Sequence, residues 1–300
     1  MIAPEWLVPL FLRVTRANAS FVSVEGARAR VAERAIRPVA YGPPRFQRAV
    51  EVDVRWVDGW PVYTVTPTKT RPTGNVILLH GGAWVNEIVV QHWNLAEQIA
   101  LESNTTVTVP IYPLVPFGSA VPVAHGVAAL VRDGRERHGH VCLIGDSAGG
   151  QIALSVAQLV RDEGIVLPAT VLIAPALDLT WSNPRIPIVQ PTDPWLAVPG
   201  GRVLADLWAG DADIRDPLVS PLFGDMRGLG PITVFTGTRD ILCVDVPLLA
   251  DKARTAGVAI EVIEATGRVH DYPLLPTRSG RDARRAITGI LARGTSGGVA

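Results

Sequence analysis

The sequence predicts an α/β fold in which a mostly parallel, eight-stranded sheet carries helices on both faces. Runs rich in β-branched residues alternate with stretches of helical periodicity, as is typical of parallel strands joined by crossover helices. Several runs are almost continuous in Val, Ile and Leu, as expected of strands that are buried on both faces. With 300 residues, of which 48% are hydrophobic and 19% charged, the chain can form its core without disulfides or metals.

The strands are expected at the apolar runs of the sequence. Asp58-Gly59-Trp60 separates the first two runs, and an Asp-Gly pair between alternating segments indicates a hairpin, so the sheet is expected to open antiparallel. The predicted strands cover residues 50–57, 61–66, 76–79, 106–111, 141–144, 170–174, 232–236 and 259–263. The predicted helices cover residues 92–102, 119–137, 148–163, 244–257 and 280–293.

Two regions depart from this alternation and are expected to form a helical cap. Residues 1–40 have the pattern of one or two helices. Residues 181–216 are rich in Pro, Trp and Asp and interrupt the passage from the sixth strand to the seventh, where so long an insertion is usually functional. The predicted organisation is therefore a cap segment over 1–40, an α/β domain over 41–293 that includes the insertion, and a flexible tail over 294–300.

Charge and composition argue against several classes of protein. The 28 basic and 28 acidic residues balance, and no dense basic run occurs, which disfavours nucleic acid as a partner. Cys142 and Cys243 are expected to be buried free thiols, and the ligands of a zinc site are missing. No run is long enough for a membrane span, and the apolar run from Trp6 to Leu12 lacks the features of a secretory signal. A soluble, cytoplasmic protein without metal or cofactor is expected.

The segment Gly145-Asp146-Ser147-Ala148-Gly149 matches the pattern G-x-S-x-G. It follows a predicted strand and precedes a predicted helix, which is the context that this motif requires. The sharp turn exposes the serine hydroxyl, and the flanking glycines leave room for strained backbone. A plain Gly/Ser turn is the alternative interpretation, but the context predicts that Ser147 is a nucleophile.

His80-Gly81-Gly82-Ala83-Trp84 follows the third predicted strand. Acyl transfer requires N–H donors that point at the oxygen of a tetrahedral intermediate, and glycines leave the approach to such donors open. We expect the oxyanion hole to consist of the N–H groups of Gly81 and Gly82, completed by that of Ala148. His80 is expected to orient the loop.

A serine nucleophile requires a histidine base and an orienting acid, which follow the serine when the motif is of this kind. Of the six histidines only His270 lies beyond Ser147, so His270 is the predicted base. Asp240, just after the seventh predicted strand, is the predicted acid. Asp245 is the alternative, although its position suits the N-terminus of the next helix. Asp271 adjoins the histidine without an obvious means of orienting it.

Taken in order, these motifs resemble the hormone-sensitive-lipase family of α/β-hydrolases, the bacterial family IV esterases. Three further segments share the resemblance, at residues 112–116, 174–180 and 216–222. The resemblance extends over about residues 45–290 and implies an α/β-hydrolase fold with a cap and a catalytic triad of Ser147, Asp240 and His270. It also implies a serine carboxylesterase, a carboxylic ester hydrolase that acts on short- to medium-chain esters without a cofactor.

The sequence departs from the family pattern at two places. Ala83 replaces the third glycine of H-G-G-G, and Tyr112-Pro-Leu-Val-Pro116 lacks the arginine of Y-R-L-A-P and the acidic residue that usually follows it. Asp146 either holds neighbouring loops or serves the start of the next helix. Trp84, Trp208 and Tyr112 are expected to contact the substrate, with ordinary packing as the alternative.

Two other functions remain open at this stage. The same triad would serve an arylformamidase or another amidase, because H-G-G-x-W also resembles arylformamidases. A ligand-binding protein without turnover is the less favoured alternative, because such proteins tend to lose the histidine. The expected partner is a small-molecule ester, and an unpaired eighth strand would offer an edge for a homodimer.

Overall fold

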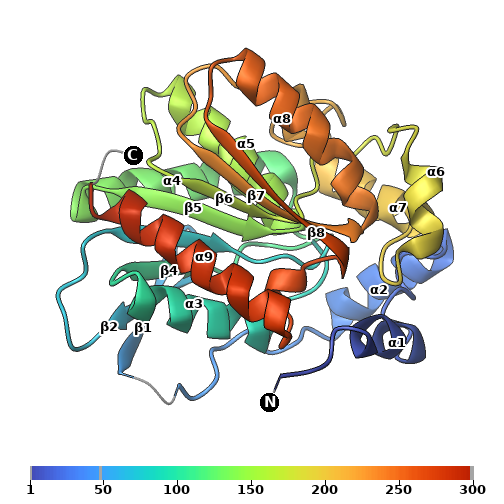
Figure 1. The fold of residues 1–300 in the computed structure, drawn as a ribbon, viewed down its shortest axis with the longest axis horizontal. Coiled ribbons are helices and arrows are strands. Elements are labelled where there is room, and N and C mark those ends of the chain that lie inside the picture. The colour runs from blue at the N-terminus through green and yellow to red at the C-terminus, as the bar shows by residue number, and fades with distance from the viewer. Residues whose placement is uncertain (1, 47–48, 298–300) are drawn as a thin grey trace.

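The computed structural model describes residues 2–46 and 49–297 and has the predicted eight-stranded sheet with helices on both faces (Figure 1). The strand order is β1-β2-β4-β3-β5-β6-β7-β8. β1 pairs antiparallel with β2, β2 pairs antiparallel with β4, and all other neighbours are parallel. The strands are β1 (Val50–Val57), β2 (Trp60–Pro67), β3 (Asn75–Leu79), β4 (Thr106–Pro110), β5 (Val141–Asp146), β6 (Thr170–Ile173), β7 (Ile232–Arg239) and β8 (Ile260–Val269).

The predicted hairpin is confirmed by the register of the first two strands. Val57 pairs with Trp60, so the turn consists of Asp58 and Gly59, whose φ angles are 50° and 84°. Two positive φ angles are typical of the type I′ turn, which an Asp-Gly pair favours.

Two hydrophobic clusters, one on each face of the sheet, hold the helices in place. Along β3, Ile77 and Leu79 belong to one cluster and Val76 and Leu78 to the other, as the two-residue period of a strand requires. The first cluster lies under α4 (Ala120–His138), α5 (Ala148–Asp162) and α8 (Val246–Thr255). The second lies under α3 (Val90–Glu102) and α9 (Arg278–Thr295).

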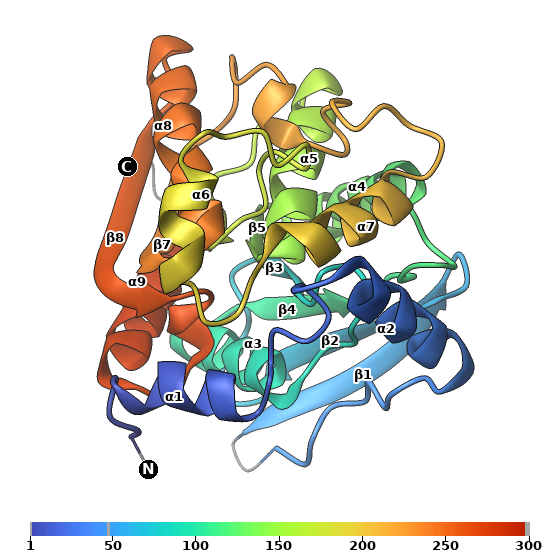
Figure 2. The same ribbon diagram turned by 90° about the vertical axis from the view of Figure 1, so that its right-hand side faces the viewer.

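The remaining helices lie at the carboxyl ends of the parallel strands (Figures 1 and 2). Two come from the N-terminal segment, α1 (Leu7–Val14) and α2 (Val24–Ile36), and two from the 181–216 insertion, α6 (Ile186–Val189) and α7 (Val198–Ala209). α2 packs on α7, and the Gly200 N–H donates to the Phe21 carbonyl at 2.7 Å. Four 3₁₀ segments complete the elements, η1 (Gln190–Thr192), η2 (Pro221–Phe223), η3 (Ile241–Asp245) and η4 (Tyr272–Leu274).

Two expectations about the ends and the thiols need correction. α9 continues through Thr295, which is fully buried, so the predicted tail over 294–300 begins too early; residues 298–300 lie outside the described part of the chain. Both cysteines are free, but Cys243, on η3 at the sheet edge, is only half-buried, whereas Cys142 is buried. Across the described ranges, no helix combines the length and apolar character needed to cross a bilayer.

Candidate active site

Ser147 occupies a strained turn between β5 and α5. Its φ and ψ angles are 52° and −114°, and its N–H donates to the Ile173 carbonyl at 2.8 Å. A positive φ is costly for a residue with a side chain, and such strain is concentrated at functional sites. The turn also packs closely on β3, because a side chain at Gly149 would collide with the Leu79 carbonyl. The sheet therefore presents the Ser147 hydroxyl at the carboxyl ends of its strands.

The structure brings the three predicted triad side chains together. The Nε2 atom of His270 lies 2.9 Å from the Ser147 Oγ, and its Nδ1 atom lies 2.8 Å from the Oδ2 of Asp240. Asp240 follows β7 and His270 follows β8, so adjacent parallel strands deliver the acid and the histidine to the same edge. The second oxygen of Asp240 accepts the Leu242 N–H at 2.9 Å, which fixes the carboxylate.

The electrostatic surroundings of His270 favour its protonated form. Burial by itself lowers the pKa of His270, but the negative charges of Asp240 and Asp271 outweigh it and raise that pKa well above its usual value. With the Nδ1–H donated to Asp240, a neutral imidazole presents the lone pair of Nε2 to the Ser147 hydroxyl. The ring can then take the serine proton, and the nearby carboxylates stabilise the imidazolium that results.

Asp271 is a second carboxylate on the same ring. Its Oδ2 lies 3.2 Å from the His270 Nε2, and its backbone is left-handed, with a φ of 51°. The Oδ1 of Asp271 is buried and has no hydrogen-bond partner among the described residues. Burial raises the pKa of Asp271 to about 6, against the opposing effect of the His270 charge. The contact could not be predicted from the sequence, because a left-handed Asp has no sequence signal beyond the tolerance of Asp for that conformation.

Asp146 joins two loops behind Ser147. The Val89 N–H donates to the Nδ1 of His92 at 3.0 Å, so Nδ1 is an acceptor and the ring proton is on Nε2. The Nε2–H then donates to the Oδ2 of Asp146, also at 3.0 Å. Burial raises the pKa of Asp146, but the charge and the hydrogen bond of His92, with a smaller effect of His80, outweigh it and lower that pKa below its usual value. Of the two interpretations of Asp146, the contacts favour the one in which it holds neighbouring loops.

Gly81 packs against Asp146. A side chain at residue 81 would collide with the Asp146 carboxylate, so only glycine fits there. The N–H groups of Gly81 and Gly82 stay the predicted loop donors of the oxyanion hole. The third predicted donor, Ala148, lies in the first turn of α5, where backbone N–H groups lack helical partners.

His80 and Tyr112 orient the same loop. The Nδ1 of His80 lies 2.7 Å from the Gly81 carbonyl, and burial lowers the pKa of His80 to about 4, so the ring is neutral and donates this bond. The Tyr112 hydroxyl donates to the His80 carbonyl at 2.5 Å, and the two rings stack with centroids 4.5 Å apart. These contacts brace the loop where the arginine of the family pattern is missing.

Trp84 and Trp208 form a stacked pair above α5. Their ring centroids lie 5.9 Å apart, and both indole N–H groups donate to the Oε1 of Gln151, at 3.2 and 2.8 Å. Gln151 stands one turn after Ser147, and its amide group donates to the Leu218 carbonyl. Trp84, Trp208 and Tyr112 are all buried, so their predicted contact with substrate stays a prediction. Gln151 belongs to no motif, so its role could not be predicted from the sequence.

The 181–216 insertion contacts the triad directly. The Oδ2 of Asp193 accepts the N–H of Ile241, the residue after Asp240, at 2.9 Å. Burial, with the Asp240 charge as the next cause, raises the pKa of Asp193 to about 6. The ring of Trp195 stands edge-on to the His270 ring with centroids 5.6 Å apart. These contacts place the insertion against both the acid and the base.

Asp245, the alternative acid, does not take part in the triad. Its Oδ1 accepts a hydrogen bond from the Nδ2 of Asn183 at 2.7 Å, and its side chain makes no capping bond to α8. Asp245 does stand at the N-cap position of α8, as expected, but its carboxylate bonds Asn183 of the insertion instead of a helix amide. Burial raises the pKa of Asp245 to about 6.

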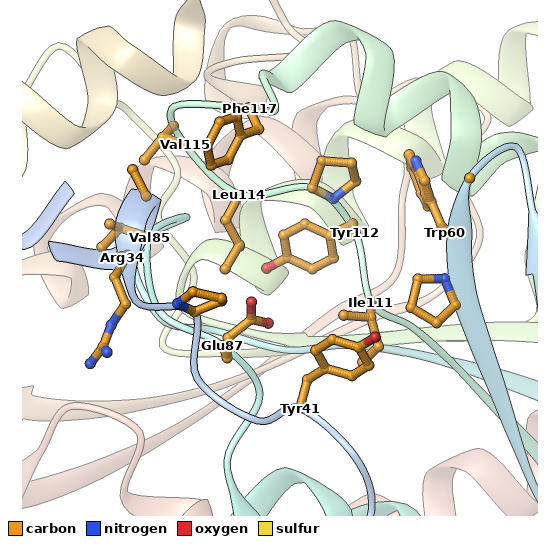
Figure 3. Close-up of a pocket in the computed structure, with 15 residues that line it drawn as sticks. Arg34, Tyr41, Trp60, Val85, Glu87, Ile111, Tyr112, Leu114, Val115 and Phe117 are labelled. Carbon is orange, nitrogen blue, oxygen red and sulfur yellow. The ribbon is translucent and has the colours of Figure 1, made fainter. Parts of the chain in front are cut away.

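A cavity of about 300 Å³ lies to one side of the oxyanion loop (Figure 3). It opens between the end of α2, the β1–β2 turn and residues 111–117, and its walls carry the aromatic rings of Tyr41, Trp60, Tyr112 and Phe117. Glu87 is the carboxylate in its lining, and burial raises the pKa of Glu87. Among the described residues, those that line this cavity do not include Ser147, Asp240 or His270.

Comparison with known proteins identifies the class of this chain. The sequence model of the alpha/beta hydrolase fold family matches residues 76–274, a range that contains all three triad positions. The chain therefore belongs to the α/β-hydrolase family, and the fold expected from its sequence is confirmed.

The named relatives agree with this class. The chain is 34% identical over 241 residues to a triacylglycerol lipase of Mycobacterium tuberculosis, an alignment that covers 78% of this chain and 50% of the lipase. It thus spans about half the length of that relative. An acetyl-hydrolase of Streptomyces hygroscopicus is 29% identical, with 76% of this chain and 77% of the relative covered.

A solved structure extends the likeness to the whole fold. The hormone-sensitive-lipase homologue EstE7 from a metagenome library superposes with a TM-score of 0.83 at 20% identity, covering 99% of this chain and 100% of the homologue. This likeness agrees with the family match in showing the α/β-hydrolase fold over nearly the whole chain.

Proposed function

We propose that this protein is a serine carboxylesterase that hydrolyses short- to medium-chain carboxylic esters through an acyl-enzyme on Ser147. The observation that carries the proposal is the continuous hydrogen-bonded chain from the Ser147 Oγ through His270 to Asp240, with distances of 2.9 and 2.8 Å. The named relatives, a lipase and an acetyl-hydrolase, support the same reaction class.

In the proposed reaction, Nε2 of His270 removes the Ser147 proton as the serine oxygen attacks the ester carbonyl carbon. The carbonyl electrons move onto the oxygen, which accepts hydrogen bonds from the predicted donors, the N–H groups of Gly81, Gly82 and Ala148. When the intermediate collapses, the carbon–oxygen bond to the alcohol breaks and the imidazolium returns the proton to the leaving oxygen. Water then repeats the sequence on the acyl-enzyme and releases the acid.

The stacked indoles support the preference for shorter acyl chains. Trp84 directly follows the oxyanion loop, and with Trp208 it fills the space above Gln151, one helical turn from the nucleophile. We propose that these two buried rings limit the space for a long acyl chain beside Ser147. We expect kcat/KM to fall from p-nitrophenyl butyrate to the laurate, and Trp208→Ala to weaken that fall.

Ser147→Ala provides the decisive test. A graded series of p-nitrophenyl esters should be hydrolysed by the wild type, whereas loss of the nucleophile should reduce kcat by about 10⁶-fold. Ser103→Ala is a matched control, since Ser103 is also buried but its hydroxyl donates to the Thr288 carbonyl between α3 and α9. Equal hydrolysis by wild type and Ser147→Ala would refute the proposal, and parallel assays on aryl formamides measure the amidase alternative.

A further inference from the structure

Many of the exposed large hydrophobic residues lie within the first 22 positions of the chain. Nineteen large hydrophobic residues are exposed in the described part of the chain, and seven of them are found here. They are Ile2, Trp6, Leu7, Leu10, Phe11, Val14 and Val22. Isolated exposed hydrophobics need no explanation, but a concentration of this kind indicates a contact surface.

Five of these residues form one face of α1 and its N-cap. At 100° per residue, Trp6, Leu7, Leu10, Phe11 and Val14 fall within a single arc of the helix. Trp6 is 70% exposed, Phe11 64% and Val14 74%. The opposite side is also apolar and carries the buried Leu12, which faces the protein. The helix thus uses one apolar face for packing and leaves a second in water; we call this second face the α1 face.

Contacts at the start of α1 attach this helix beside the loop that carries His270. The Oε1 of Glu5 accepts the Ser279 N–H at 2.9 Å, and its carboxylate lies 3.6 Å from the Arg268 guanidinium. The Ala3 N–H donates to the Pro276 carbonyl at 2.7 Å. Figures 1 and 2 show α1 at the same end of the molecule as α6 and α7, so the helix belongs to the end at which the candidate site lies.

The charges around the α1 face favour an anionic surface as its partner. Arg13 and Arg16 are exposed at the end of the helix, whereas Glu5, the single acidic residue between positions 2 and 22, is engaged by Arg268 and Ser279. Helices that lie in a membrane interface combine Trp, Phe and Leu on one face with basic residues at its border. Each Arg near an anionic leaflet adds to the attraction.

A second copy of the chain fits the α1 face less well. A helix of eight residues is about 12 Å long, so two such faces would bury far less than the roughly 1,000 Å² that a specific interface requires. A lipid surface has no such minimum, because each inserted side chain contributes separately. We infer that the α1 face, bordered by Arg13 and Arg16, docks the protein on anionic lipid surfaces.

Sedimentation with vesicles tests this inference without reference to catalysis. The wild type should bind vesicles of phosphatidylcholine mixed with phosphatidylglycerol, and less strongly vesicles of phosphatidylcholine alone. Trp6→Ser and Phe11→Ser should each weaken binding by about tenfold or more, because each removes a large inserted side chain. Trp56→Ser is the matched control, since Trp56 is 68% exposed on β1, and it should bind like the wild type.

Charge reversal and solution behaviour complete the test. Arg13→Glu combined with Arg16→Glu should reduce binding to the mixed vesicles more than binding to neutral ones. Hydrolysis of soluble p-nitrophenyl acetate should stay unchanged in these variants, which shows that they fold. The inference is overturned if the wild type does not sediment with mixed vesicles, or if Trp56→Ser loses as much binding as Trp6→Ser. It is also overturned if sedimentation velocity shows that the wild type is a dimer and that Phe11→Ser only converts this dimer to a monomer.

Discussion

Asp240 and Asp271 both contact the His270 imidazole, but the loops after β7 and β8 hold them in different ways. Asp240 accepts the Nδ1–H at 2.8 Å, and its other oxygen accepts the Leu242 N–H, so both oxygens are satisfied. Asp271 approaches Nε2 at 3.2 Å from a left-handed backbone, and its other oxygen is buried without a partner in the described residues.

This difference implies that Asp240 orients the His270 ring, whereas Asp271 competes with Ser147 for its Nε2 atom. Asp240 fixes the tautomer that leaves Nε2 free to accept the serine proton. Asp271 and the Ser147 hydroxyl both contact the Nε2 atom of His270. An ionised Asp271 therefore favours the protonated imidazolium, whose Nε2–H can donate to the Asp271 carboxylate. A buried oxygen without a partner costs about 1–3 kcal/mol. Such an arrangement persists only where the surrounding structure enforces it.

Asp240→Asn should show the largest effect on this comparison. The amide can still occupy the space, but its NH₂ group favours the wrong tautomer of His270, and kcat should fall by about 10⁴-fold. Steady-state hydrolysis of p-nitrophenyl acetate measures the loss. Asp245→Asn is the control, because that buried carboxyl bonds Asn183 and should leave kcat close to the wild-type value. A fall below tenfold in Asp240→Asn would contradict the orienting role.

Asp271→Asn should move the pH profile while leaving most of the activity intact. The Asp271 charge raises the pKa of His270, so its removal lowers that pKa. Because the neutral imidazole is the active form, the acid limb of kcat/KM should shift to lower pH. Asp240, Asp146, Asp193 and His92 also act on this cluster and remain in the variant. Asp271→Ala should shift the limb in the same direction, and an unmoved or upward-shifted limb in both would contradict the competing role.

Ala83→Gly should give the smallest effect, a change in stability and not in catalysis. Ala83 is a second residue with a left-handed backbone and so serves as a comparison for Asp271. The φ of Ala83 is 53°, a conformation that costs an L-residue about 1–2 kcal/mol, whereas glycine adopts it freely but loses about 0.5–1 kcal/mol of chain entropy. The free energy of unfolding should rise by up to about 1 kcal/mol, as urea denaturation measures. Asn tolerates the left-handed region, so Asp271→Asn should show no comparable gain of backbone origin. A clear loss of stability in Ala83→Gly would show that the Ala83 methyl packs usefully.

The parts of the site that the sequence predicted depend on local patterns and on chain order. The strand–turn–helix context identified Ser147, and the position of His270 as the last histidine made it the candidate base. Parallel strands bring their carboxyl ends to one edge, which is why Asp240 and His270 meet Ser147 despite their separation in the chain. These inferences needed no knowledge of side-chain orientation.

The parts that were missed depend on contacts between distant segments. Gly81 packs against the Asp146 carboxylate, which His92 on α3 also contacts. Asp193 belongs to an insertion without a regular pattern, and its partner Ile241 lies 48 positions away. Asp271 contacts the His270 ring from a left-handed backbone, a conformation that its sequence does not announce. None of these features has a spacing or a composition that a sequence could reveal.

The hydrogen bond between Asp193 and the Ile241 amide bears on how this enzyme class can be redesigned. If the 181–216 insertion were exchanged for that of a relative, a loop without an acceptor at position 193 would leave a part-buried amide unsatisfied beside Asp240, at a cost of about 1–3 kcal/mol. The insertion therefore does not behave as an interchangeable lid. A chimera that retains Asp193 and Trp195 while varying the rest of the segment preserves the support of the acid and changes only the walls of the site.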